Sequence, residues 1–191
     1  MRVRLSMLTF GAAVLLGGCA QAAAQPPQPP QREAVEGLSN PVAAAAGGAC
    51  ALLDFAAVRR TLGVTFDVAA ATGAGRTRSC VLRATAARHP DLLLTESRTT
   101  ADAAAFGEEV RPSGARRVTG LGRAAYRATV APTRGRGPAV EIGWLTADGR
   151  LLTLRHTLAA GAPAAAAAAL GGRLHALATE VDAAAAKARR S

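Results

Sequence analysis

Alternating apolar residues in the last third of the chain constrain its fold more than any other feature. In residues 140–146 apolar side chains alternate as in a half-buried strand. The segment 151–157, after Asp148-Gly149, is expected to be a second strand that runs back beside it. An Asp-Gly pair between such segments is the strongest short-range signal of a β-hairpin. With a further strand expected at 124–130, these segments predict an antiparallel meander.

Two more strands are expected upstream of the meander. Residues 79–85 and 92–98 each read as a strand, and the segment 86–91 between them reads as the turn of a hairpin. Residues 64–68 form a candidate short strand. The two glycines in 71–78 favour a turn or loop there.

Helices are expected before and between these strands. Apolar residues in 54–62 recur with nearly helical spacing, Asp54 can cap the first turn, and Gly63 can end the helix. A second helix is expected over 100–109, with Thr99 or Thr100 as its cap and Pro112 beyond its end.

The last segment predicts a long C-terminal helix. Pro163 suits a first-turn position, and an apolar stripe recurs at spacings of four, three and four: Leu170, Leu174, Leu177 and Val181. Gly171 and Gly172 weaken this helix, and they would allow close packing against a sheet. The order of segments predicts an α+β domain, in which an antiparallel sheet of about five strands has helices packed on one face and carries one disulfide.

The first 18 residues have the pattern of a secretory signal peptide. Arg2 and Arg4 open an apolar run from Leu5 to Gly18, which at 14 residues is shorter than the roughly 20 of a membrane-spanning helix. The residues "LGGC" at 16–19, which end this run on Cys19, resemble the bacterial lipobox. That resemblance implies that Cys19 becomes the mature N-terminus and carries a diacylglycerol and a further acyl chain. We predict a protein anchored by lipid to the extracytoplasmic face of the cell membrane. The alternative is an ordinary signal peptide with a chance cysteine.

A low-complexity segment follows the lipobox. Residues 19–48 are rich in Ala, Pro and Gln and include "QPPQPPQ", which favours polyproline II geometry and a semi-rigid spacer. We predict a lipoprotein signal peptide over 1–18, a tether over 19–48 and a single α+β domain over 49–191.

The charge balance is basic. Of the 23 basic residues, Arg2 and Arg4 lie in the first 18, so 21 remain with 13 acidic residues and a net charge of +8. Anionic lipid headgroups or wall polymers are possible counter-charges, and solubility alone is the simpler interpretation. The arginines are scattered and the chain has 6 aromatic residues, so we expect no nucleic-acid partner.

Two cysteines remain after Cys19 is assigned to lipidation. In an oxidising compartment Cys50 and Cys80 are expected to form a disulfide. A zinc site at these cysteines would need further ligands, and no histidine lies near either of them in sequence.

No motif in the sequence indicates a catalytic or metal centre. The three histidines, His89, His156 and His175, lack the spacing of a helical metal site. The sequence contains no Gly-x-Ser-x-Gly motif, and Glu108-Glu109 would diverge on a helix. The glycine loops lack the strand before and helix after that a nucleotide cradle requires. We therefore predict no enzymatic activity, no metal and no cofactor.

Two short motifs resemble one known family. The segment "CALLDFAAVRRTLG", the later Cys80, and "VTGLGRAAY" with Gly120, Leu121 and Gly122 resemble the DUF3558 domain of actinobacterial lipoproteins. The resemblance spans about residues 50–158. One departure is that Cys80 is followed by Val81, Leu82 and Arg83, where the family often has a tryptophan. Membership implies a cell-surface lipoprotein of unknown activity, and it supplies no catalytic residues.

These observations favour a binding or sensing module for an apolar or anionic small ligand. The candidate ligand-binding residues are Arg123, Tyr126 and Trp144, because arginine and large aromatics are the usual anchors of binding sites. Core packing and surface charge are the alternative roles of these side chains. Alternative functions are an accessory lipoprotein that docks to an envelope protein, and an enzyme acting on wall polymer or lipid.

Overall fold

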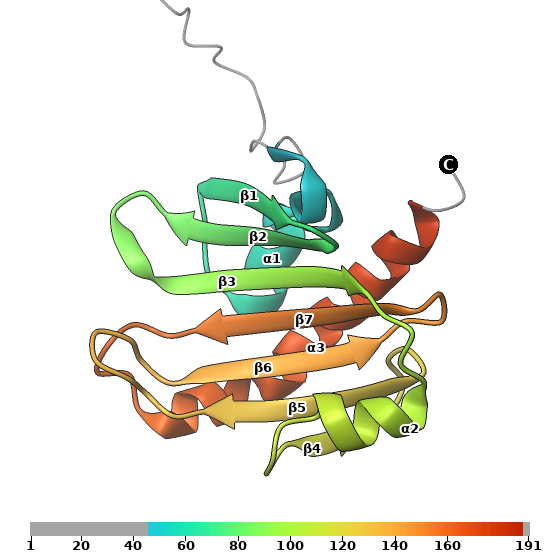
Figure 1. The fold of residues 1–191 in the computed structure, drawn as a ribbon. Coiled ribbons are helices and arrows are strands. Elements are labelled where there is room, and N and C mark those ends of the chain that lie inside the picture. Colours follow the sequence, from blue (N-terminus) through green and yellow to red (C-terminus); the bar gives the residue numbers. More distant parts are fainter. Residues whose placement is uncertain (1–45, 189–191) are drawn as a thin grey trace, which may run out of the picture. The chain divides into compact units, whose positions relative to one another are not determined.

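An antiparallel sheet forms the centre of the domain, with strands in the order β1-β2-β3-β7-β6-β5-β4 (Figure 1). The computed structural model describes residues 46–188, so Cys19, the predicted signal peptide and most of the predicted tether lie outside it. Within residues 46–188 the sheet has seven strands: β1 (Val68–Ala74), β2 (Thr77–Ala84), β3 (Ala87–Arg98), β4 (Arg116–Val118), β5 (Ala124–Val130), β6 (Ala139–Leu145) and β7 (Arg150–Thr157).

The α+β class is confirmed, and the prediction of about five strands was wrong. The two strands that were missed are β1 and β4, at the two edges of the sheet. β1 has the sequence "VAAATGA", whose alanines and glycine have low strand propensity, and it forms because the turn at Gly75-Arg76 pairs it with β2. The predicted loop over 71–78 is therefore a hairpin, and of the predicted strand 64–68 only Val68 is extended in the sheet.

The remaining strands lie close to their predicted bounds, and the largest difference is at the start of β3. β5, β6 and β7 lie within one residue of the predicted meander. β3 begins at Ala87, so most of the predicted turn over 86–91 is strand, and the turn itself is Thr85-Ala86.

The helical segments described beside the sheet are η2, a 3-10 helix (Gly48–Leu52), α1 (Phe55–Leu62), α2 (Ala103–Ala105), η3, a π-helix (Phe106–Val110) and α3 (Ala164–Lys187). As expected, the Asp54 side chain accepts a hydrogen bond from the Ala56 amide at 2.7 Å, and Gly63 ends α1 in the left-handed conformation. The helix expected over 100–109 differs, because Asp102 caps it and its second half is a π-helix.

The helices do not all lie on one face of the sheet. α1 and α3 cover the face that carries Leu82, Leu94, Ile142 and Leu154, where the main apolar core forms (Figure 1). α2 and η3 lie against the opposite face, beside β4 and β5, where Phe106 packs on Tyr126. Among the described residues, no helix covers the rest of that opposite face. No helix within residues 46–188 is long and apolar enough to span a membrane.

Close packing of α3 depends on Gly171, as the sequence suggested. A Cβ at Gly171 would lie 2.9 Å from Cδ of Arg127, so a larger residue there would require the Arg127 side chain to shift. The apolar stripe of α3 is confirmed, since Leu174, Leu177 and Val181 are buried in the core.

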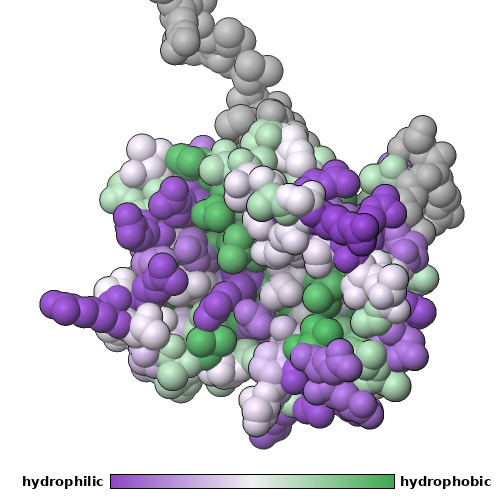
Figure 2. Space-filling view, in the orientation of Figure 1, coloured by the Kyte–Doolittle hydropathy of each residue, from purple (hydrophilic) through white to green (hydrophobic). Residues whose placement is uncertain are grey.

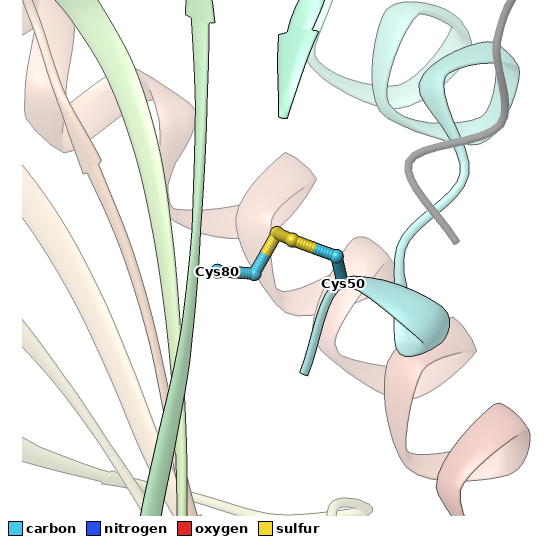
Figure 3. The surroundings of a disulfide bond; sticks show 2 residues. All are labelled: Cys50 and Cys80. Atoms are coloured by element: carbon cyan, nitrogen blue, oxygen red, sulfur yellow. A yellow bond between two sulfur atoms is a disulfide. The ribbon is translucent and has the colours of Figure 1, made fainter. Parts of the chain in front are cut away.

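Cys50 and Cys80 form the expected disulfide (Figure 3). Cys50 lies in η2, which precedes α1, and Cys80 lies on β2, with the two Cα atoms 4.9 Å apart. Both residues are fully buried. The bond therefore fixes the start of the domain to the sheet.

Candidate functional site

The three predicted ligand-binding residues do not converge on one cleft. Tyr126 lies opposite Gly143 in the β5–β6 ladder, and the adjacent Ala125 lies opposite Trp144. Because successive residues of a strand point to opposite faces, the Tyr126 and Trp144 side chains lie on opposite sides of the sheet. Arg123 lies just before β5, at the end of the sheet where β6 finishes.

Trp144 lies in the apolar core between the sheet and α3. Its relative exposure is 0%, and its indole Nε1 donates a hydrogen bond to Oδ1 of Asp182 at 2.9 Å. This bond joins β6 to α3. Trp144 therefore has no surface through which it could contact a ligand from solvent in this conformation.

Tyr126 fills the space above Gly143 on the other face. Its hydroxyl donates to Oε1 of Glu141 at 2.8 Å, and its ring centroid lies 5.9 Å from that of Phe106. Burial, together with the nearby Glu141 charge and hydrogen bond, raises the pKa of the Tyr126 hydroxyl well above its usual range. The tyrosine therefore stays protonated, and its ring supports η3.

Arg123 lines a pocket between η3 and strands β4 and β5. The pocket has a volume of about 240 Å³, and Phe106 and Ala124 form part of its apolar wall. Two further arginines line it, Arg111 and Arg117. We call these three arginines and the space between them the arginine pocket.

Backbone contacts hold two of these guanidinium groups in place. Nη1 of Arg111 donates to the Ala115 carbonyl at 2.9 Å, and Nε of Arg123 donates to the Thr146 carbonyl at 3.3 Å. Nε of Arg111 is buried and has no hydrogen-bond partner among the described residues. A buried donor of this kind is costly unless a partner satisfies it.

The π-helix brings the third guanidinium close. A Cβ at Gly107 would lie 3.2 Å from Nη2 of Arg117, so the glycine of η3 leaves the space that this side chain occupies. Single π-turns inside helices are frequent at functional sites. Here the π-turn places Phe106 and Gly107 toward β4 and β5.

Positive charge in the arginine pocket is not compensated by its walls. No acidic side chain is among the described residues that line it. None of the ion pairs within residues 46–188 includes Arg111, Arg117 or Arg123. By contrast, a smaller pocket of about 160 Å³ at the other end of the sheet has both Asp91 and Arg155 in its wall. The arginine pocket is therefore suited to an anion.

Comparison with protein-family models, with curated proteins and with solved structures finds no match to the chain.

Another charged cluster near this end of the sheet has an internal role. Arg150 donates to Oε1 of Glu96 at 2.7 Å, to Oδ2 of Asp148 at 2.8 Å and to the Ala185 carbonyl at 3.0 Å. Burial alone would raise the pKa of Asp148, but the Thr146 hydrogen bond and the Arg150 charge outweigh it and lower the pKa. These contacts join β7 to β3 and to the end of α3.

Two of the three histidines come together in the structure. His156 is fully buried and its Nδ1 lies 2.8 Å from the Asp91 carbonyl, while Nδ1 of His89 lies 3.4 Å from Oδ2 of Asp91. Burial lowers the pKa of His156, so its ring stays neutral. Among residues 46–188 no three His, Cys, Asp or Glu side chains are placed to hold a metal ion.

Sequence reasoning included Arg123 in its candidate set and missed Arg111 and Arg117. Arg117 and Arg123 flank a short glycine-containing segment, and Arg111 follows the π-turn. The only sequence signal was the density of arginine between residues 111 and 123. It could not identify which side chains share one face, because β4 was not recognised as a strand.

Proposed function

We propose that the protein is a lipid-anchored extracytoplasmic lipoprotein whose domain binds a small organic anion in the arginine pocket. The observation that carries this proposal is the convergence of Arg111, Arg117 and Arg123 on a pocket in which no carboxylate is among the lining residues of segment 46–188. Three permanently charged groups around one small space repel one another unless an anion lies between them.

The dimensions and walls of the pocket suggest the class of ligand. At about 240 Å³ it is below the roughly 300–1,000 Å³ of drug-sized sites, so the ligand is small. Arginines recognise carboxylate and phosphate groups through paired N–H donors. Phe106 and Ala124 offer apolar contact to the remainder of the ligand. A phosphate or carboxylate group joined to a short apolar or aromatic part fits this description.

The location outside the cytoplasm rests on the N-terminal sequence. The basic start, the short apolar run and the lipobox resemblance favour acylation at Cys19. The Cys50–Cys80 disulfide is consistent with an oxidising compartment. Membership of the DUF3558 family would agree with this arrangement. The role we propose is binding without catalysis, because the part of the chain that the structure describes places no histidine, cysteine or carboxylate in the wall of the arginine pocket.

Calorimetric titration of the purified protein with phenyl phosphate, benzoate and uncharged phenol tests the proposal. The two anions are expected to bind and phenol is not. Loss of a hydrogen bond to a charged group costs about 1.5–3 kcal/mol, so R117Q and R123Q should each weaken phenyl phosphate binding at least about tenfold.

Arg116 provides a matched control for these variants. It lies beside Arg117 on β4 and is exposed, but alternation along the strand points its side chain to the other face. R116Q makes the same change in net charge and should leave affinity within about twofold of wild type. Equal weakening by R116Q and R117Q would show that only net charge matters. Absence of binding by both anions would reject the proposed function.

The uncovered face of the sheet supports a second candidate function, docking to an envelope protein. On this face Val81, Leu93 and Leu151 are partly exposed, beside the hydrogen-bonded hydroxyls of Ser79 and Thr95, which are 3.3 Å apart. Figure 2 shows apolar surface over these strands, interrupted by hydrophilic groups. Recovery of a stable membrane partner that R117Q and R123Q still bind would favour this function.

A further inference from the structure

A second pocket lies on the uncovered face of the sheet, at the end away from the arginine pocket. It has a volume of about 160 Å³, and its wall includes the start of β3, the end of β7 and the loop between β5 and β6 (Figure 1). In the ladder Asp91 lies opposite Thr157, and Leu93 lies opposite Arg155. These four residues alternate with the buried leucines of the core, so their side chains lie on the uncovered face.

Charges of both signs line this pocket. Asp91 contributes a carboxylate, and Arg136 and Arg155 contribute guanidinium groups. Within residues 46–188 neither arginine forms an ion pair with Asp91. Nη1 of Arg155 lies 3.9 Å from Oε2 of Glu141, and Oδ2 of Asp91 lies 3.4 Å from Nδ1 of His89. Oδ1 of Asp91 is buried and has no hydrogen-bond partner among the described residues. Opposite charges therefore share the pocket without neutralising each other.

The register of the sheet accounts for this separation. Arg155 is two residues from Thr157, which lies opposite Asp91, so the two charged side chains are diagonal neighbours. Diagonal neighbours across an antiparallel pair are about 7–8 Å apart, compared with about 5 Å for residues directly opposite. The gap accommodates a small molecule that carries one charge of each sign.

Backbone hydrogen bonds fix the loop that carries Arg136. The Thr133 amide donates to the Arg136 carbonyl at 3.2 Å, and the Arg136 amide donates to the Thr133 carbonyl at 2.9 Å. The Gly137 amide donates to the Leu158 carbonyl at 3.1 Å, and glycine lets this loop lie against the Ala159 carbonyl, which a Cβ would strike. A loop fixed in this way costs little to order when a ligand binds.

We propose that this pocket, which we call the zwitterion pocket, binds a small molecule with an ammonium and a carboxylate on one carbon, the chemistry of a free amino acid. The ammonium bonds to Asp91, and the carboxylate bonds to Arg155 and Arg136. A ligand with only an anion would face the Asp91 carboxylate, and one with only a cation would face two guanidinium groups. At about 160 Å³ the pocket is well below the roughly 300–1,000 Å³ of drug-sized sites, which favours a short side chain.

Titration of the ¹⁵N-labelled protein with L-alanine, followed by nuclear magnetic resonance, provides the test. The backbone amide signals of Leu93 and Gly137 should shift together, with one dissociation constant. Propionate lacks the ammonium and ethylamine lacks the carboxylate, so each should bind there at least about tenfold more weakly. The amide signal of Gly107 in η3 should stay in place, which separates this site from the arginine pocket.

Two variants test the assigned roles. D91N and R155Q should each weaken L-alanine binding at least about tenfold, because each removes a charged partner. D91N also removes the repulsion between two carboxylates, so propionate should bind D91N more tightly than it binds wild type. A variant that had lost its fold would not gain this affinity. D102N makes the same change in net charge as D91N, keeps a side chain that can cap α2 and should bind L-alanine within about twofold of wild type.

An absence of shifts at Leu93 and Gly137 on addition of L-alanine would overturn the proposal. So would equal affinities for L-alanine and propionate, or propionate binding that D91N does not improve. The zwitterion pocket and the arginine pocket share no lining residue, so failure of phenyl phosphate to bind would leave this result unaffected.

Discussion

At the scale of single residues, the ring of Tyr126 occupies the space that a side chain at Gly143 would need. A Cβ at Gly143 would lie 2.4 Å from Cε1 of Tyr126, whose ring is held by Phe106 and by the bond to Glu141. G143A should therefore displace the ring and lower the free energy of unfolding by about 1–3 kcal/mol in urea denaturation.

Gly172 provides the comparison for that variant. It is exposed in α3, and a Cβ there would meet nothing within 4 Å. Because alanine favours a helix over glycine, G172A should stabilise the domain by up to about 1 kcal/mol. Equal stabilities of G143A and wild type would show that the tyrosine ring has room to move.

Burial of His156 predicts a pH dependence of stability. Its folded pKa is lowered mainly by burial, so below the unfolded value of about 6.5 the unfolded chain binds a proton that the folded chain does not. Stability should fall as the pH decreases from 7.5 through 6.5 to 5.5. In H156Q this slope should be smaller, as measured by urea midpoints at each pH. Identical slopes in the two proteins would refute this origin.

Residue-level features near the pocket were only partly predictable. Arg123 was predicted because arginines are usual anchors of binding sites, and the density of arginine between residues 111 and 123 is a further signal visible in the sequence. Trp144 was selected as a large aromatic, yet the ladder register places it in the core against Asp182. Register depends on pairing between strands, which a single sequence does not specify.

At the scale of elements, strong periodic segments were predicted well and weak edge strands were not. β5, β6 and β7 have alternating apolar residues and a clear Asp-Gly turn, and their bounds match within one residue. β1 is mostly alanine and β4 has only three residues, two of them arginines, so both form because a neighbouring strand pairs with them. Tertiary pairing thus overrides local propensity at both edges.

The disulfide is the element-scale feature with the largest expected effect on stability. It closes a loop with a sequence separation of 30, which in the chain-entropy model gives about 3–4 kcal/mol. The double variant C50A/C80A should lower the free energy of unfolding by at least about this amount in guanidinium denaturation. C19A, which we expect to leave the disulfide intact, serves as the control. A loss below about 1 kcal/mol would contradict the role assigned to the bond.

At the scale of the whole molecule, lipid anchoring at Cys19 is the prediction that decides location. C19S removes the thiol to which diacylglycerol would attach, so the protein should leave the membrane fraction, since stable anchoring needs the acyl chains. Mass spectrometry of the N-terminal peptide should find the acyl groups on wild type alone. A20S changes the neighbouring residue, keeps the thiol and should remain membrane-bound. Equal membrane association of C19S and wild type would reject the anchor.

The central claim is that three arginines form one anion site, and nuclear magnetic resonance of arginine side chains tests it most directly. Phenyl phosphate added to the labelled protein should shift the Nε–Hε signals of Arg111, Arg117 and Arg123 together, with one dissociation constant. The signal of Arg116 should stay in place. Shifts spread evenly over the exposed arginines, or none at these three, would contradict the account.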